Sequence, residues 1–206
     1  MTFQRLAGTG SKNIASQINL TVSDVVGSPN TVDFTFKNNI GVVSSVDQIY
    51  FEDGGLLGSV QLIQSGTSFS ASRGSDLPGA GLLNPVFAPT RAFVAGVNIL
   101  SSELGSLPDP LRGLNSSGDS IVFRFALKNG ATYADVLSAL ALAPSPFGSL
   151  RVGVVADNID GALAADSFTT NSPAAVPIPP AAIAGLVGLG AVAGFGWLRH
   201  KRLARA

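Results

Sequence analysis

The chain is poor in the residue types that most often carry out chemistry. It contains no cysteine, which excludes a disulfide scaffold, cysteine-ligated zinc or iron–sulfur sites, and thiol catalysis. Its single histidine, His200, lies within the last seven residues, so no histidine base or metal ligand is expected in the body of the chain. Charged residues are only 13% of the total and balance to zero, which argues against a disordered charged chain and against a nucleic-acid-binding surface.

What the chain does contain indicates one domain with many turns and a distinct end. Its 206 residues are enough for one sizeable core, and its 24 glycines and 12 prolines favour turns over long helices. Four basic residues fall within the last eight positions, namely Arg199, Lys201, Arg202 and Arg205. Without them, residues 1–198 carry nine basic and 13 acidic side chains, a formal charge of −4. Such a split is more typical of a localisation signal than of a catalytic site.

Three segments follow one another at the C-terminal end. Residues 173–180 include four prolines, which predicts an extended spacer within a linker at 171–180. Residues 181–198 carry no charge and predict a transmembrane helix of about 27 Å, just long enough to span the hydrocarbon of a bilayer. By the positive-inside rule the basic tail at 199–206 stays in the cytoplasm, and everything before the helix lies across the membrane. The alternative is a buried helix of a soluble protein, which would show the polar face that 181–198 lacks.

Together these segments resemble the PEP-CTERM sorting signal of Gram-negative bacteria. The residues that carry the resemblance are Val176, Pro177, Ile178, Pro179, Pro180 and Ala181, then the 181–198 helix and the basic cluster. Ile178 stands where the family usually has glutamate, so the form is closer to the variant written VPLPA. The resemblance implies recognition by an exosortase, a membrane cysteine transpeptidase that cleaves near the motif and transfers the body elsewhere. Such proteins commonly accompany exopolysaccharide and biofilm production.

The start of the chain does not match an export leader. Residues 1–14 lack an apolar run of seven or more residues, which a secretory leader requires. We therefore expect the true start to lie upstream of Met1, the alternative being insertion by the C-terminal helix alone. Residues 1–12 are predicted to be a flexible N-terminus.

The body, residues 13–170, shows the two-residue period of half-buried strands. Val32, Phe34 and Phe36, for example, alternate with polar neighbours. The same pattern, strong in the first four segments and weaker in the others, marks Ile14–Ser23, Thr31–Lys37, Ile121–Lys128, Leu150–Val154, Val46–Phe51, Val60–Ile63, Thr67–Ala71 and Phe93–Val97. Strands with one polar face predict antiparallel sheets. The expected fold is mainly β, an antiparallel, jelly-roll-like β-sandwich with one short helix, plus the single C-terminal transmembrane helix.

The one helix of the body is predicted at 132–140. Thr132 offers an N-cap with Asp135 three residues later, and Tyr133, Val136, Leu137 and Leu140 form an apolar stripe that Pro144 terminates. The segments 123–127, 132–140, 150–154 and 166–168 also resemble, more loosely, the close of ectodomains that often precede this sorting signal. That resemblance implies an extracellular β-rich domain and carries no known catalytic residue.

Two groups of side chains are candidates for chemistry in the body. Glu52 and Asp53 could be the carboxylate pair of a glycosidase, but adjacent strand residues point to opposite faces, and an exposed turn is expected instead. Asp157, Asn158 and Asp160 alternate oxygen ligands as a calcium loop does, although the same residue types also build ordinary turns.

The sequence therefore predicts an exported, non-enzymatic surface or matrix protein with no catalytic residue and no cofactor. Its expected partners are an exosortase, the membrane and extracellular polysaccharide, with no nucleic acid. It is expected in the inner membrane with a periplasmic domain before processing, and afterwards at the cell surface or in the extracellular matrix. The competing interpretation is a carbohydrate- or calcium-binding adhesin module on a simple C-terminal membrane anchor.

Overall fold

The computed structural model describes residues 1–72, 76–96, 113–142, 149–162 and 164–170. These residues form ten β-strands, one α-helix and two short 3₁₀ turns. The elements in chain order are β1 (Phe3–Gly8), β2 (Ile18–Asp24), β3 (Thr31–Asn38), β4 (Ser45–Glu52), β5 (Leu57–Ser65), β6 (Phe69–Ser72), η1 (Ala80–Leu82), β7 (Arg91–Ala95), β8 (Ser120–Leu127), α1 (Tyr133–Ala141), β9 (Arg151–Asp157), η3 (Ile159–Gly161) and β10 (Asp166–Thr170).

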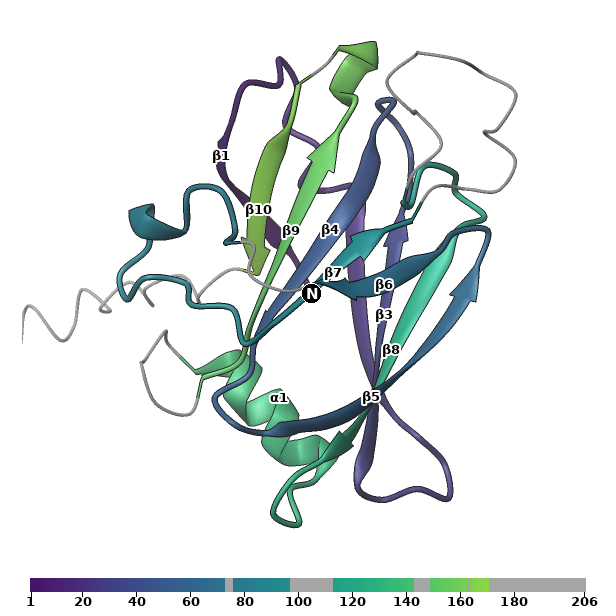
Figure 1. Cartoon of the computed structure of the whole chain (residues 1–206), viewed down its shortest axis with the longest axis vertical. Helices are drawn as coiled ribbons and strands as arrows, with labels where there is room; N and C mark the ends of the chain where they lie inside the picture. Colours follow the sequence, from purple (N-terminus) through teal and green to yellow (C-terminus); the bar gives the residue numbers. More distant parts are fainter. Residues whose placement is uncertain (73–75, 97–112, 143–148, 163, 171–206) are drawn as a thin grey trace, which may run out of the picture. The chain divides into compact units, whose positions relative to one another are not determined.

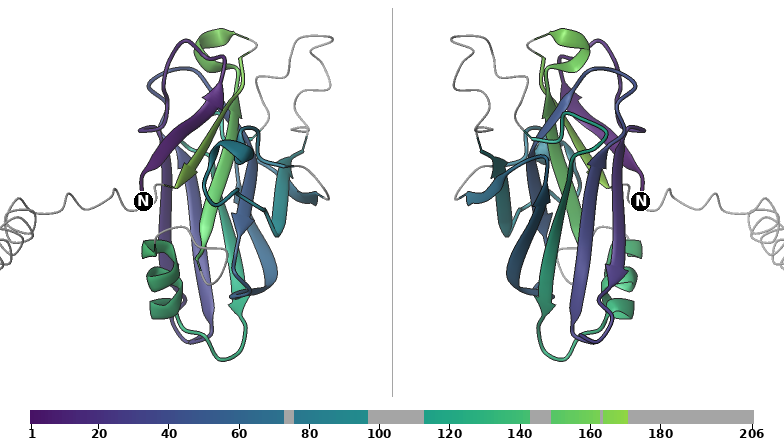
Figure 2. Two further views of the ribbon diagram at one scale, coloured as in Figure 1. Left: turned by 90° about the vertical axis from the view of Figure 1, so that its left-hand side faces the viewer. Right: turned by 90° about the vertical axis from the view of Figure 1, so that its right-hand side faces the viewer.

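The strands form two antiparallel sheets that pack face to face (Figures 1 and 2). The larger sheet has six strands in the order β1-β10-β9-β4-β7-β6, and the smaller has four in the order β2-β3-β8-β5. From β3 to β6 the chain changes sheet at every step, because β3 and β5 lie in the small sheet and β4 and β6 in the large one. The prediction of a mainly β, antiparallel sandwich with one helix is confirmed for this part of the chain.

Phenylalanine side chains fill the space between the sheets. Phe34 and Phe36 of β3 and Phe123 and Phe125 of β8 point inward from the small sheet, and all four are fully buried. Phe51 of β4 meets them from the large sheet, edge to face, with ring centroids 5.3 Å from Phe34 and 5.1 Å from Phe125. The predicted alternation is correct here, because every second side chain of β3 enters this core.

The large sheet is covered on its outer face as well. Leu77 and Phe87, from the segment between β6 and β7, pack with Tyr50 of β4 and Val155 of β9 in a second, smaller core. The residues of β9 from Arg151 to Ala156 are therefore all buried. A strand buried on both faces shows a weak alternation of polar and apolar residues, which explains why the sequence indicated only its first part.

Helix α1 begins with the predicted cap. The Thr132 hydroxyl accepts a hydrogen bond from the Asp135 amide, and the Asp135 carboxylate accepts one from the Thr132 amide at 2.7 Å. The Thr132 hydroxyl also donates to the Asp135 carboxylate. The hydrogen bonds that this carboxylate accepts from the Thr132 hydroxyl and amide lower the pKa of Asp135 below its usual range. Val136 and Leu140 of the predicted stripe are buried, but Leu137 is 42% exposed because it faces away from the sandwich. Pro144 lies outside the described residues.

Three predictions near strand ends were wrong in detail. Residues 3–8, predicted within a flexible N-terminus, form β1, which pairs with β10. Ile14 is buried but lies in a turn that the hydrogen bond from the Gln17 amide to the Ile14 carbonyl closes, so β2 begins only at Ile18. Thr67 precedes β6, whose first residue is Phe69.

The predicted C-terminal segments at 171–180, 181–198 and 199–206 lie outside the described residues. Among the residues that are described, no helix combines the length and the apolar character needed to cross a bilayer.

Candidate functional site

The two ends of the described chain meet at one edge of the large sheet. Phe3 in β1 lies opposite Thr170 in β10, so the domain begins and ends in neighbouring strands. Thr170 is buried, and its hydroxyl accepts a hydrogen bond from the Val152 amide at 3.1 Å. The last described residue before the predicted linker is therefore held inside the sheet.

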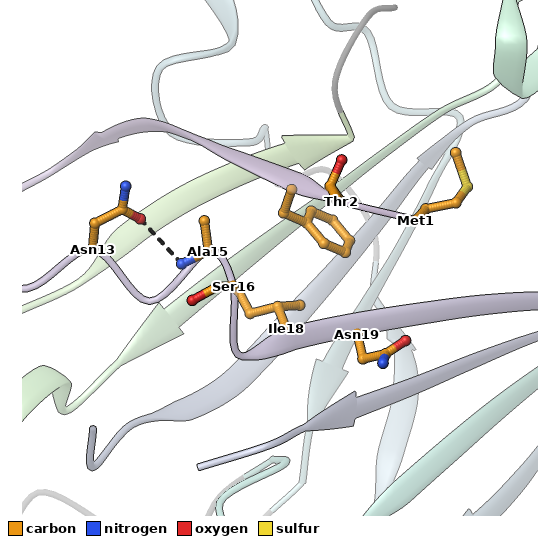
Figure 3. A pocket seen from close by; sticks show the side chains of 8 residues that line it. Met1, Thr2, Asn13, Ala15, Ser16, Ile18 and Asn19 are labelled. Atoms are coloured by element: carbon orange, nitrogen blue, oxygen red, sulfur yellow. Dashed lines mark hydrogen bonds between the residues drawn. The ribbon is translucent and has the colours of Figure 1, made fainter. Parts of the chain in front are cut away.

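A pocket of about 440 Å³ lies beside the start of β1 (Figure 3). One side is formed by Met1, Thr2 and Phe3, and the other by the segment that leads into β2, including Asn13, Ser16 and Asn19. The Ala15 amide donates to the Asn13 side-chain oxygen at 3.0 Å, and the Met1 amino group donates to the Leu20 carbonyl at 2.7 Å. No acidic, basic or histidine side chain lines this pocket. Its lining side chains offer hydrogen bonds and apolar contact.

Glu52 is the counterion of a buried arginine. It ends β4 opposite Arg151 of β9, and the two side chains form an ion pair. Arg151 also donates to the carbonyls of Pro85 and Val86, at 2.8 Å and 2.7 Å, and lies over the Phe87 ring at 5.2 Å. The Glu52–Arg151 pair thus fastens the segment that covers the outer face of the large sheet.

Asp53 has a different arginine partner. Its side chain is 5% exposed and lies 3.5 Å from the Arg91 guanidinium, and it accepts a hydrogen bond from the Gly55 amide at 2.9 Å. Arg91 also donates to the Leu57 carbonyl and lies over the Phe125 ring. The expectation of an exposed turn at Glu52 and Asp53 is therefore wrong, because ion pairs with Arg151 and Arg91 hold the two carboxylates.

The calcium candidates lie at the end of β9. Asp157 is the last residue of the strand, and Asn158 and Asp160 follow in the left-handed backbone region, at φ 52° and 61°. The Asp160 amide donates to the Val43 carbonyl at 2.9 Å, which fixes the turn. Within the described ranges, no three His, Cys, Asp or Glu side chains are grouped so that they could hold a metal ion. Calcium binding at this turn stays a prediction.

The sequence did not predict the buried ion pair between Arg5 and Asp166. The Asp166 carboxylate is fully buried, lies 2.9 Å from the Arg5 Nε and accepts a hydrogen bond from the Gly10 amide at 2.8 Å. Gly8 approaches so closely that an added Cβ would lie 1.8 Å from Asp166 Oδ1. The two charges are more than 160 residues apart in the chain, and no local pattern connects them.

The predicted sorting residues, Val176 to Ala181, and the basic residues Arg199, Lys201, Arg202 and Arg205 lie outside the described residues. No family model, curated protein or solved structure matches the chain.

Proposed function

We propose that the protein is an exported, non-enzymatic surface or matrix protein whose C-terminal segment is a sorting signal for an exosortase-type enzyme. The observation that carries the proposal is the order of segments at 173–206, in which a proline-rich motif precedes an uncharged stretch and a basic cluster. The β-sandwich is the cargo, and the exported body is released from the membrane when the signal is cut. The mature protein is proposed to reside in the extracellular polysaccharide.

The prolines give the motif a shape that a processing enzyme can bind. Pro177 and Pro179 hold the segment extended, so little conformational entropy is lost when it enters an active site. Ten residues at 171–180 in this conformation reach about 31 Å, enough to separate a folded domain from the bilayer surface. The uncharged helix and the basic cluster then keep the motif close to the outer face of the membrane.

We infer further that the sandwich is jelly-roll-like. In a jelly roll, consecutive strands alternate between two sheets, and the strands of each sheet interleave. The steps from β3 to β6 and from β7 through β8 to β9 alternate in this way, whereas β2–β3, β6–β7 and β9–β10 are consecutive strands paired within one sheet. The β-sandwich architecture is shared by many cell-surface domains, which is consistent with an exported cargo.

The proline residues allow a direct test of the signal. The double variant Pro177→Ala/Pro179→Ala is expected to insert normally but to lose processing, because the two alanines release the extended conformation in which the motif is bound. Pro173→Ala is the matched control, because it removes a proline from the same spacer upstream of the motif. The measurement is the fraction of shortened chain in cells that contain the exosortase, with each chain fused to an export leader.

Replacing Arg199, Lys201, Arg202 and Arg205 by neutral residues should affect orientation instead, because the tail then no longer resists passage across the membrane. If the double proline variant is processed at the normal rate in the correct orientation, Val176–Ala181 is only a linker. The protein would then be a simple membrane-anchored ectodomain.

A carbohydrate-binding adhesin is the second candidate, and the pocket beside β1 favours it. The pocket combines side-chain amides of Asn13 and Asn19 and the hydroxyl of Ser16 with apolar surface, which is the mixture that a sugar requires. Binding to a glycan array that Ser16→Phe abolishes would support this function. A rise in melting temperature with calcium that Asp157→Asn removes would support the calcium-binding form of the adhesin.

A further inference from the structure

The two sheets have four edge strands, β1 and β6 in the large sheet and β2 and β5 in the small one. An edge strand presents unpaired backbone N–H and C=O groups, and stable monomers protect such edges with charges, prolines, bulges, short strands or covering segments. Within the described ranges, β5 has the least of this protection.

Three edges carry a recognisable protection. In β1 the register shifts between Arg5 and Ala7, and Arg5 adds a charge. The β6 strand has only four residues. On β2 the Val22 carbonyl accepts a hydrogen bond from the Tyr133 hydroxyl, and α1 lies beside the strand (Figure 2).

The β5 edge differs from all three. At nine residues it is the longest strand in the described part of the chain, and it contains neither a charged residue nor a proline. Its register shift, between Leu57 and Val60, and the hydrogen bond from Arg91 to the Leu57 carbonyl are confined to the start of the strand. Pairing with β8 is regular from Val60 to Ser65. β8 is the only strand of the described residues that pairs with it.

The surface next to this edge is uncharged and partly apolar. Ile63 is 40% exposed and lies opposite the half-buried Val122 of β8. The nearest charges on the same face, Arg124 and Asp33, neutralise each other through two hydrogen bonds of 2.7 Å, which raise the pKa of Arg124 above its usual value. Along Val60–Ser65 a partner strand therefore meets no charged side chain of β5, and Lys128 lies beside Gly58 at the start of the strand.

We propose that β5 pairs with β5 of a second copy of this chain, antiparallel about a twofold axis, to form a continuous eight-stranded sheet. The core-facing sides of both copies lie on the same side of the joined sheet only if odd-numbered residues of one β5 face odd-numbered residues of the other. The twofold axis, perpendicular to the sheet, therefore passes midway between the two copies of one residue, such as Leu62 or Ile63. Both arrangements bring the Ile63–Val122 strips of the two copies side by side. Identical strands can lie opposite each other here because neither carries a charge that would repel its twin.

The absence of cysteine makes the pairing easy to detect. In Ile63→Cys the introduced thiol is the only one in the chain, and pairing about Ile63 places two such thiols opposite each other. Pairing about Leu62 places Ile63 opposite Gln61 of the other copy, so Gln61→Cys/Ile63→Cys is the variant that links that arrangement. The full chain is purified in a mild nonionic detergent and oxidised, and covalent dimer is read on a non-reducing gel. Thr21→Cys is the matched control, because Thr21 is also exposed, on the opposite edge strand of the same sheet. Dimer is expected from Ile63→Cys or from Gln61→Cys/Ile63→Cys, and not from Thr21→Cys.

A second pair of variants tests the interface without a cross-link. Gln61→Lys/Ile63→Lys places like charges across the axis, and loss of the dimer is expected in sedimentation velocity. Asn19→Lys/Thr21→Lys adds the same charge at exposed positions of β2 and should leave the dimer intact. Melting curves of all variants confirm that they fold.

Three results would overturn the proposal. They are a wild-type chain that is monomeric at all concentrations, equal cross-linking from the cysteine variants of β5 and β2, and a dimer that survives Gln61→Lys/Ile63→Lys. A monomeric wild-type chain would also be observed if the natural occupant of the β5 edge were an extended peptide of another protein.

Discussion

Replacing Phe51 by alanine should be among the most damaging single changes in the domain. Phe51 is fully buried at the centre of the sandwich and contacts five other phenylalanine rings. The centroid distances run from 5.1 Å to 6.0 Å, to Phe125, Phe34, Phe123, Phe36 and Phe93. It is the side chain through which β4 of the large sheet contacts β3 and β8 of the small one.

The expected loss in the free energy of unfolding is about 4 kcal/mol. Phenylalanine-to-alanine changes in cores cost roughly 3–5 kcal/mol, because transfer free energy is lost and a cavity remains. The aromatic pairs favour the upper half of that range, since each edge-to-face contact adds about 0.5–1.5 kcal/mol beyond its buried area and the five are not additive. In a domain of this size 1 kcal/mol shifts the melting temperature by about 2–4 °C, so a drop of roughly 12 °C is expected.

The assay is thermal and urea unfolding of the full chain in mild detergent, followed by circular dichroism. Phe51→Leu keeps the apolar volume but loses the ring geometry, and should fall between wild type and alanine. Val26→Ala is the control, because Val26 is 96% exposed and should change stability by less than about 0.5 kcal/mol. A Phe51→Ala loss below about 1.5 kcal/mol with an unchanged denaturant slope would refute the claim that this cluster holds the sheets together.

Two further predictions concern particular contacts. Asp135→Asn should be less stable than wild type at pH 7, because the Thr132 hydrogen bonds lower the pKa of Asp135 in the folded state. This stabilisation is complete above the unfolded pKa of about 4 and is lost as pH falls through the lower folded pKa, so the two chains should converge in that range; a pH-independent difference would contradict the assignment. Gly113→Ala should destabilise the domain far more than Gly55→Ala in urea unfolding, although both glycines have positive φ. An added Cβ at Gly113 would lie 1.9 Å from the Val46 carbonyl oxygen, whereas at Gly55 it meets open space; equal losses would show that backbone strain alone decides.

The sequence predicted those parts of the fold that local patterns determine. The strand at β3 follows from the alternation of Val32, Phe34 and Phe36, and the start of α1 follows from Thr132 and Asp135, three residues apart. Each of these two signals is contained within a few consecutive residues. The alternation in the strands also predicts which side chains face the core, and the sandwich could be inferred from it.

Features that depend on distant partners were missed. The β1 strand shows no two-residue alternation of apolar and polar residues, and its place in the sheet depends on β10 at the other end of the domain. Asp53 is buried because Arg91, 38 residues later, comes to lie beside it. Ile14 shows the opposite case, since it is buried in a turn, and burial alone does not make a strand.

The candidate pocket could not be predicted either. Its two sides are residues 1–3 and the segment at 13–19, and they form a pocket only because β1 and β2 belong to different sheets. The proposed sorting signal, by contrast, could be predicted from the sequence because its proline, apolar and basic segments are contiguous.

The most direct test of the proposed function is the intact mass of the exported chain with and without an active exosortase. The full-length chain, fused to an export leader, is expressed in a host that has the sorting system and in the same host with the exosortase nucleophile replaced. We expect a chain shortened near Val176–Ala181 only where the enzyme is active, and the full-length mass where it is not. An unchanged full-length mass in both hosts would contradict the proposal that this protein is an exosortase substrate.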